Sequence, residues 1–423
     1  MIELKRETER VILVGLNLPG EEDVQGSLDE LKELAATAGA ETVGQLIQSR
    51  EQMHPGTYVG KGKIEELKDL LWELDATGII CDDELSPIQM KNLQDELDVK
   101  VMDRTLVILD IFAGRASTSE GKLQVELAQL KYRQTRLTGF GTSMSRLGGG
   151  IGTRGPGEKK LEIDRRLIKS RIAQLNRELR DVKRHREVTR EQRSRSHIPV
   201  AAIVGYTNAG KSTLLNTLTG ADILAEDKLF ATLDPTTRSW KLPCGQEILL
   251  TDTVGFIRKL PHHLIEAFRS TLEEAKYADI ILHVVDASNP QMDEQMFTVY
   301  ETLQNLGVKD KPVITVFNKQ DKIQEEQIIR DFQADYTVKI SARTGEGLPE
   351  LEETIEAVLR QQKVALECLY DYKDASVIQL IRKYGELLEE EYREDGIFVR
   401  AFVPAELYAR VSVSRGDSPK SFR

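Results

Sequence analysis

Apolar residues in the first hundred positions gather in short runs, and a longer amphipathic stretch separates each run from the next. The runs predict strands and the amphipathic stretches predict helices. The predicted strands are 11–18, 42–48, 78–83 and 99–103, and the predicted helices are 27–38, 61–74 and 86–97. Strands that alternate with single helices predict right-handed crossovers and a parallel sheet covered by helices. The loop His54–Lys63 carries Gly and Lys residues, which is consistent with a phosphate contact or with a plain helix start.

Beyond Ser119 the apolar spacing changes to steps of three, four and seven residues, which is typical of heptad stripes. The positions are Leu123, Leu127, Leu130 and Leu137, then Ile168, Ile172, Leu175, Leu179 and Val182. Two such helices joined by one loop should pack antiparallel as a coiled-coil hairpin that projects from the body. A second helix running from Glu158 to Arg195 would be ~57 Å long at 1.5 Å per residue.

The loop of this hairpin, residues 146–158, reads RLGGGIGTRGPGE and holds six glycines and one proline. Such a segment forms no helix and buries no core. Its only charges before Glu158 are Arg146 and Arg154. A flexible linker is one interpretation. The other is contact with folded RNA, whose shape and phosphates backbone N–H groups and guanidinium groups can recognise.

The most specific motif follows the hairpin, between an apolar run (Ile198–Tyr206) and an amphipathic stretch (Ser212–Gly220). The eight residues GYTNAGKS fit the P-loop pattern, in which backbone N–H groups, a helix N-terminus and a lysine hold phosphates. They are Gly205, Tyr206, Thr207, Asn208, Ala209, Gly210, Lys211 and Ser212. Ser212 is expected to bind Mg²⁺.

Further short motifs follow in a fixed order, and each of the last three directly follows a predicted strand. Candidate nucleotide contacts in FATLDPTTR are Phe230, Ala231, Thr232, Leu233 and Asp234; those in DTVG are Asp252, Thr253, Val254 and Gly255. Those in NKQD are Asn318, Lys319, Gln320 and Asp321, and those in SAR are Ser341, Ala342 and Arg343. Asp252 is expected to bind magnesium through its water shell and the Gly255 N–H to contact the γ-phosphate. Asp321 can accept the two guanine protons that adenine lacks, so GTP and GDP are the predicted ligands.

The net charge of −11 conceals an uneven distribution. Residues 131–197 hold 19 Lys and Arg against 7 Asp and Glu, so this segment is basic within an acidic chain. Such a segment suits a phosphate backbone, although a solvated helix face has the same composition. Three separated cysteines predict neither disulfides nor a zinc site, and they are expected to be core thiols. No apolar run approaches a membrane span, which predicts a cytoplasmic protein without an integral membrane segment.

The fold class predicted from these patterns is α/β multidomain. The expected domains are an N-terminal parallel α/β domain (1–114), a helical hairpin (115–197), a P-loop GTPase domain with a doubly wound sheet (198–364) and a small C-terminal α/β module (365–423). In the last of these, a strand, a helix and a strand are expected, and the acidic run Glu386–Glu391 is interpreted as a solvated helix face.

The nucleotide motifs, the preceding sheet, the hairpin and the glycine-rich loop together resemble the HflX family of translational GTPases over nearly the whole chain. The resemblance implies a protein, monomeric when free, that binds the large ribosomal subunit and its rRNA and splits stalled or idle ribosomes. It also implies that the hairpin loop, with Arg146 and Arg154, reaches toward the peptidyl-transferase region. Ribosome assembly, and RNA remodelling with ATP bound to the N-terminal sheet, remain the alternative functions.

The same resemblance implies Ser212 and Thr232 as Mg²⁺ ligands, with Thr236 and Thr237 as the alternatives to Thr232 from sequence alone. The expected catalytic set is Lys211, Asn208, Thr232 and Gly255, and Asn208 is a candidate ligand for K⁺. Phe256 stands where small signalling GTPases place a water-orienting Gln, so intrinsic hydrolysis should be slow.

Overall fold

The computed structural model describes residues 8–20, 23–145, 156–195, 198–220, 229–230, 233–261, 264, 273–323 and 329–412. These residues form two compact units. The first comprises the described parts of Met1–Lys183, Glu226–Asp234 and Ile257–Ser270, and the second those of Arg184–Ala225, Pro235–Phe256 and Thr271–Arg423. Two short segments from the nucleotide-motif region thus belong to the first unit. The described residues contain no helix long and apolar enough to cross a membrane.

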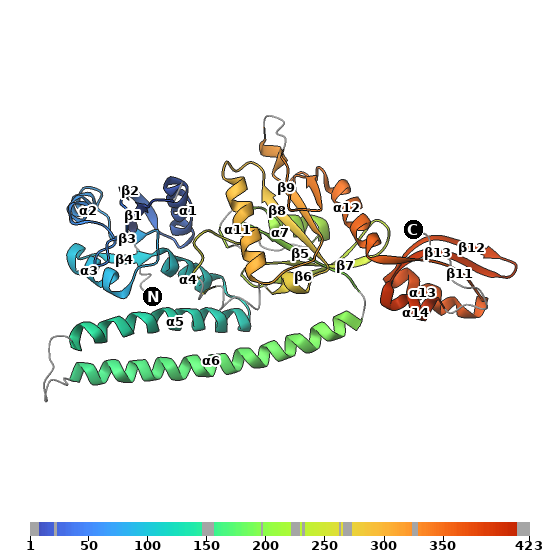
Figure 1. Cartoon of the computed structure of the whole chain (residues 1–423), viewed down its shortest axis with the longest axis horizontal. Coiled ribbons are helices and arrows are strands. Elements are labelled where there is room, and N and C mark those ends of the chain that lie inside the picture. Colours follow the sequence, from blue (N-terminus) through green and yellow to red (C-terminus); the bar gives the residue numbers. More distant parts are fainter. Residues whose placement is uncertain are drawn as a thin grey trace, which may run out of the picture. The chain divides into compact units, whose positions relative to one another are not determined.

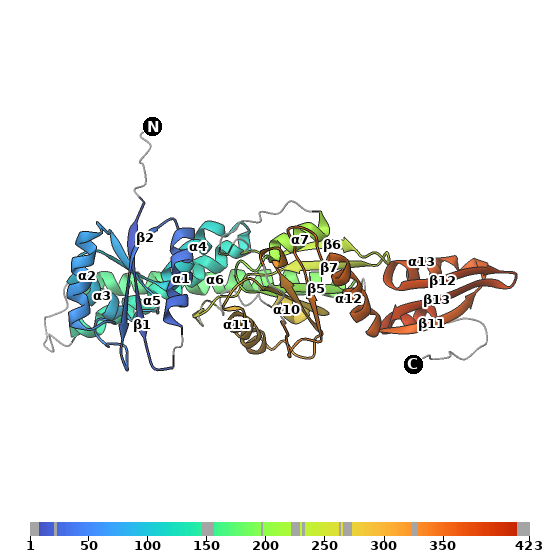
Figure 2. The same cartoon turned by 90° about the horizontal axis from the view of Figure 1, so that it is seen from above.

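The first unit is built on a four-stranded parallel sheet of order β2-β1-β3-β4 (Figure 1). Its strands are β1 (Arg10–Asn17), β2 (Glu41–Ser49), β3 (Gly78–Cys81) and β4 (Lys100–Asp103), and its helices are α1 (Val24–Thr37), α2 (Lys61–Glu73), α3 (Pro87–Leu97) and α4 (Arg104–Arg115). Figure 2 shows α2 and α3 on one face of the sheet and α1 and α4 on the other. The alternating pattern thus predicted every strand and the first three helices correctly, whereas α4 was not predicted.

The hairpin helices α5 (Ser119–Ser145) and α6 (Pro156–Arg195) lie side by side and antiparallel (Figure 1). The Arg171 guanidinium donates to both Glu126 carboxylate oxygens at 2.7 Å, and Arg165 donates to the Leu137 carbonyl at 2.6 Å. Of the predicted α6 stripe, Leu175 is fully buried and the other four positions are half-buried. The heptad interpretation is therefore confirmed for this helix.

The expectation that the hairpin projects freely is wrong for the described first part of α5. This helix buries a second face, carrying Val125, Ala128 and Tyr132, and packs against α3 and α4. The Tyr132 hydroxyl donates to Asp103 at 2.9 Å, and the Arg136 guanidinium pairs with the other Asp103 oxygen at 2.7 Å. The heptad stripe does not predict this packing, because polar contacts with Asp103 help to hold the second face of α5.

The second unit contains a six-stranded sheet of order β10-β9-β8-β5-β7-β6, in which only the edge strand β6 runs antiparallel to its neighbour. The strands are β5 (Val200–Gly205), β6 (Thr236–Lys241), β7 (Glu247–Asp252), β8 (Ile280–Asp286), β9 (Val313–Asn318) and β10 (Tyr336–Lys339). Helices α7 (Lys211–Thr219) and α12 (Leu348–Gln361) cover one face, and α10 (Glu274–Tyr277) and α11 (Met292–Asn305) cover the other (Figure 2). This doubly wound arrangement agrees with the predicted fold class.

The end of the chain forms a three-stranded antiparallel sheet of β11 (Lys363–Tyr370), β13 (Gly396–Pro404) and β12 (Glu386–Arg393). Helices α13 (Ala375–Tyr384) and α14 (Ala405–Val411) pack on it through a separate apolar core. The helical interpretation of Glu386–Glu391 is wrong, because the run lies in β12. Arg400 on the neighbouring strand offsets its charge, pairing with Glu389 at 3.4 Å and with Glu367 of β11 at 2.6 Å.

The prediction that all three cysteines are core thiols is correct only in part. Cys81 is a buried core thiol at the end of β3, Cys368 is half-buried, and Cys244 is exposed.

Candidate active site

The P-loop joins the central strand β5 to the N-terminus of α7, as the motif requires. Gly205 and Gly210 adopt positive φ angles of 154° and 95°. A Cβ on Gly205 would lie 2.2 Å from the Val284 carbonyl oxygen, and one on Gly210 would lie 2.2 Å from the Asn318 amide nitrogen. Both positions therefore need glycine for backbone conformation and for space.

Lys211 is the first residue of α7, and its ammonium lies inside the loop. It donates to the carbonyl oxygens of Tyr206 at 2.7 Å and Gly205 at 3.2 Å. Burial lowers the pKa of Lys211 to about 8; Asp252 opposes this shift, and Lys319 adds to it. A buried cation with a lowered pKa is stabilised by an anion, and a phosphate group supplies that charge.

Asp252 ends β7 and meets the P-loop through Ser212. The Ser212 hydroxyl donates to an Asp252 carboxylate oxygen at 2.8 Å, and Asp252 is fully buried. A hydroxyl and a carboxylate at this separation provide hard oxygen ligands, which suit Mg²⁺ held directly by Ser212 and through water by Asp252.

The D-x-x-G turn packs directly on the P-loop backbone. The Thr207 N–H donates to the Phe256 carbonyl at 2.8 Å, and the Phe256 N–H donates to the Gly205 carbonyl at 3.1 Å. A Cβ on Gly255 would lie 2.9 Å from Thr207 Cα and 3.1 Å from Lys211 Nζ, so only glycine fits there. The Phe256 side chain is buried and apolar and cannot orient a water molecule.

The N-K-x-D motif follows β9, and its first residue, Asn318, connects two loops. Asn318 donates to the Ala209 carbonyl at 2.9 Å and accepts the Ala342 N–H at 2.9 Å, which ties the P-loop to the S-A-R loop. The Asp321 carboxylate accepts the Ser341 hydroxyl at 2.7 Å. Lys319 adopts a φ of 65° and pairs with Asp286 at 2.7 Å.

The remaining predicted residues of the second unit surround this framework. Tyr206, Ala209, Thr253, Val254 and Ala342 are buried, Asn208 and Gln320 are half-buried, and Arg343 is exposed. Thr236 and Thr237 lie in β6, where the Thr237 hydroxyl is 3.0 Å from that of Thr251. Ala231, Thr232, Arg146 and Arg154 lie outside the described residues.

Three of the residues predicted to contact the nucleotide lie in the first unit. Phe230 adopts a φ of 55° and packs edge-to-face on Phe112, with ring centroids 4.7 Å apart. The Asp234 carboxylate accepts four hydrogen bonds from the backbone and hydroxyl groups of Ser117 and Thr118, at 2.5 to 3.0 Å. Burial alone would raise the pKa of Asp234, but these hydrogen bonds together more than offset it and lower the pKa. Leu233 between them is buried.

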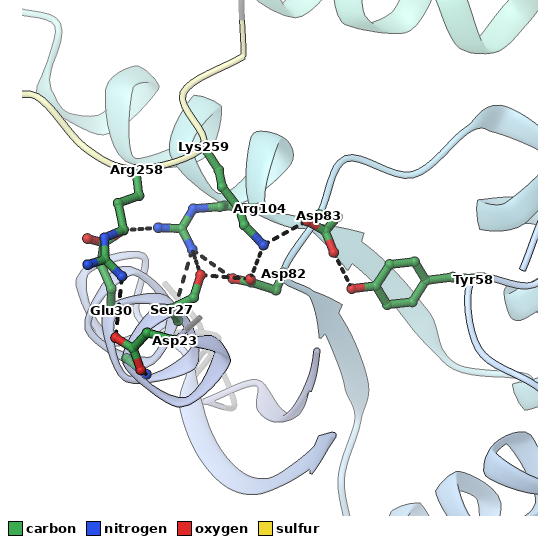
Figure 3. Close-up of polar contacts among 10 residues, drawn as sticks. Asp23, Ser27, Glu30, Tyr58, Asp82, Asp83, Arg104, Arg258 and Lys259 are labelled. Carbon is green, nitrogen blue, oxygen red and sulfur yellow. Dashed lines mark hydrogen bonds and ion pairs between the residues drawn. The ribbon is translucent and has the colours of Figure 1, made fainter. Parts of the chain in front are cut away.

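The first unit holds a second charged site that the sequence pattern did not predict (Figure 3). Its acidic cluster consists of Asp82 and Asp83, which directly follow β3, with Asp23 and Glu30 of the α1 region. The Lys259 ammonium donates to Asp82 and to Asp83, each at 2.8 Å, and Arg258 approaches Asp23 at 3.5 Å. Arg104 pairs with Asp82 at 2.7 Å and with Glu30. The one available clue was the Asp-Asp pair at the end of a predicted parallel strand, where ligands bind in such sheets.

Taken together, the doubly wound sheet, the P-loop and the motifs at the carboxyl ends of its strands define a P-loop GTPase. Known proteins agree. Residues 200–319 match the family described as 50S ribosome-binding GTPase, residues 25–113 the GTP-binding GTPase N-terminal family, and residues 115–193 the GTP-binding GTPase middle region.

Curated relatives match over most of the chain. The chain is 70% identical to GTPase HflX of Lacrimispora saccharolytica over 97% of both chains, and 43% identical to GTPase HflX of Escherichia coli over 81% of both. A GTP-binding protein from Sulfolobus solfataricus, solved with GDP, is 26% identical, with a TM-score of 0.44 over 84% of this chain and 99% of that one. The chain belongs to the HflX family of GTPases.

Proposed function

We propose that this GTPase binds the large ribosomal subunit through its helical hairpin and splits stalled or idle ribosomes, and that GTP hydrolysis resets it. The observation that carries the proposal is the charge on the solvent face of α6. The exposed positions of α6 outside the packed heptad stripe include the cations Arg166, Lys169, Arg177, Arg180 and Lys183. In a chain of net charge −11, an exposed basic helix face suits a phosphate backbone.

The family description supports a ribosomal partner for the chain, because residues 200–319 match a GTPase family described as binding the 50S ribosome. The glycine-rich loop 146–158 connects α5 to α6 and supplies Arg146 and Arg154. We assign rRNA contact to both arginines. The loop then acts on the RNA mechanically, while the basic face of α6 supplies affinity that falls with salt.

In the nucleotide site, we assign Mg²⁺ to Ser212 and Thr232, with Asp252 acting through water. The metal would neutralise charge developing on the transferred phosphate. Lys211 and the P-loop N–H groups hold the phosphates, the Gly255 N–H contacts the γ-phosphate, and Asp321 recognises guanine. Because Phe256 cannot orient water, a bound partner or a monovalent cation at Asn208 has to accelerate hydrolysis.

One alternative, an RNA remodeller with ATP at the N-terminal sheet, is opposed by the acidic cluster. The position outside the carboxyl ends of β1 and β3, where such a sheet binds ligands, is lined by Asp82 and Asp83. Those carboxylates repel triphosphate. A ribosome-assembly GTPase shares the same basic face, and it differs in binding immature particles rather than splitting mature ones.

Gradient sedimentation of intact ribosomes with protein and GTP tests the proposal through the ratio of free subunits to whole particles. Deleting 148–157, or replacing Arg154→Glu, should abolish splitting while basal GTP hydrolysis stays nearly unchanged. If the loop-deleted protein splits ribosomes as well as the wild type, the loop is a linker and the mechanism is wrong. Binding to precursor particles without splitting of mature ribosomes would favour the assembly function.

The role of α6 needs its own variants. Arg177→Glu with Arg180→Glu should weaken large-subunit binding and lower the salt dependence by about one unit of slope per lost phosphate contact. Lys32→Glu, a charge reversal at an exposed position of α1, is the matched control. If both variants lose the same amount of large-subunit binding, the effect is one of overall charge and α6 is not part of the binding surface.

A further inference from the structure

The segment that follows the D-x-x-G motif places a lysine in the acidic cluster of the N-terminal sheet. Asp82 and Asp83 lie where strand order reverses between β1 and β3, the position at which parallel α/β sheets bind their ligands. Here that position holds the Lys259 ammonium, 2.8 Å from a carboxylate oxygen of each (Figure 3). The chain itself therefore supplies the bound group.

The surrounding side chains are arranged to receive this cation. The second Asp82 oxygen accepts Arg104 at 2.7 Å, and the second Asp83 oxygen accepts the Tyr58 hydroxyl at 2.7 Å. Ser27 donates to the Asp82 oxygen that Lys259 also contacts. Arg104 pairs with Asp82 and Glu30, Arg258 approaches Asp23, and Lys259 pairs with Asp82 and Asp83, so Lys259 supplies the positive charge next to Asp83.

The backbone conformation of Lys259 and the direction of its pKa shift both indicate that the contact with Asp82 and Asp83 holds the segment that follows the D-x-x-G motif. Lys259 adopts a φ of 51°, a conformation that non-glycine residues reach only at a cost. It lies in an exposed turn, yet its side chain is only 29% exposed. Burial alone would lower the pKa of Lys259, but Asp82 and Asp83 more than offset this and raise it, so the lysine remains charged.

Lys259 is three residues beyond Phe256, whose carbonyl accepts the Thr207 N–H of the P-loop. In the same conformation the Lys211 ammonium is bonded to P-loop carbonyls. A Cβ on Gly255 would lie only 3.1 Å from Lys211 Nζ. We expect a γ-phosphate contacted by both residues to separate them, and Gly255 is four residues before Lys259 in the chain.

We propose that the acidic cluster is a binding site for the Lys259 ammonium and that this contact and the γ-phosphate oppose each other. GTP then releases Lys259 from the N-terminal sheet, and the bound lysine lowers GTP affinity without an equal effect on GDP. Since coupling between two ligands is reciprocal, each weakens the other by the same factor.

Calorimetry with a slowly hydrolysed GTP analogue and with GDP tests this coupling. Lys259→Met removes the charge while keeping the length of the side chain, and Asp83→Asn weakens the same contact from the other side. Each should raise the ratio of analogue to GDP affinity, by about tenfold for Lys259→Met. The double variant should add little to either single one, because both break one interaction. Lys32→Met at an exposed α1 position is the control and should leave the ratio unchanged.

If Lys259→Met leaves the ratio of analogue to GDP affinity unchanged, the proposal is wrong. It is also wrong if Lys259→Met changes this ratio and Asp83→Asn does not. A measurement on the wild-type protein guards against misfolded variants. Reaction of Lys259 with an amine-specific reagent, followed by mass spectrometry, should speed up with the GTP analogue and not with GDP. Equal protection in both states would contradict release.

Discussion

The side-chain amide of Asn318 joins two loops by donating to the carbonyl of Ala209 and accepting the N–H of Ala342, both at 2.9 Å. Asn318 is fully buried and belongs to the motif usually assigned to base recognition. Its hydrogen bonds go to the backbone of the P-loop and of the S-A-R loop. The phosphate-binding and base-binding loops are thus coupled through one side chain.

We therefore predict that Asn318→Ala weakens GTP and GDP binding by similar factors. The substitution leaves two buried backbone groups without their partner, at a cost of about 2–4 kcal/mol. Calorimetry with both nucleotides and a thermal melt measure the two effects. A loss confined to the guanine contacts, with unchanged melting temperature, would show that Asn318 acts on the base alone.

Asp321→Asn should instead change which base is preferred. The carboxylate that can accept two guanine protons becomes an amide that pairs with the 2-oxo group of xanthine, so GTP affinity should fall by at least about 100-fold while that for xanthosine triphosphate rises. Ser341 can still donate to the Asn oxygen, so the fold should persist. Asp310→Asn, an exposed position, is the control. GTP affinity that survives the change would exclude Asp321 from base recognition.

The monovalent-ion prediction requires a careful choice of variant. Asn208 has a φ of 60°, a conformation that asparagine tolerates well, so the residue could serve the turn alone. Asn208→Gly keeps that backbone conformation and removes the amide, whereas Ala would add strain. If Asn208 binds K⁺, wild-type hydrolysis runs faster in KCl than in NaCl and Asn208→Gly loses the difference. Identical rates of the wild type in the two salts would refute the ion site.

The elements that the sequence predicted well are those whose signal lies in neighbouring residues. β1 to β4 alternate with helices because each apolar run and each amphipathic stretch carries its own period. The P-loop was equally visible, since its eight residues fit one short sequence pattern, although the atoms that exclude a side chain at Gly205 and Gly210 belong to the distant Val284 and Asn318. Predictions of this kind need no knowledge of distant partners.

Three of the failures depend on distant partners. The second buried face of α5 depends on Asp103, which lies 29 positions before Tyr132. The acidic run of β12 is stable as a strand because Arg400 of the neighbouring strand lies against it. Lys259 meets Asp82 and Asp83 across more than 170 positions. Charge pairs of this range leave no period in the sequence, and only the fold reveals them.

His283 lies on β8, with its ring 4.9 Å from that of Tyr300. Burial lowers the pKa of His283 to about 4; Asp331 opposes the shift and Lys211 adds to it. The unfolded chain, with a pKa near its ordinary value of 6.5, binds a proton there more readily than the folded one. The stability that the neutral histidine contributes is therefore complete above pH 6.5 and is lost as the pH falls toward 4. Between pH 7.5 and 5 the loss from this one group should be about 2 kcal/mol.

Urea denaturation of the wild type and of His283→Leu at both pH values measures this loss as a difference between two proteins, which cancels the other titrating groups. Trp240 is buried in β6 of the same unit, and Trp72 is 86% exposed, so a Trp72→Phe background leaves Trp240 as the single fluorescence probe. The free energy of unfolding of His283→Leu should fall less between pH 7.5 and 5 than that of the parent. If His283→Leu and the parent lose the same stability, His283 does not titrate in this range and its burial is incomplete in solution.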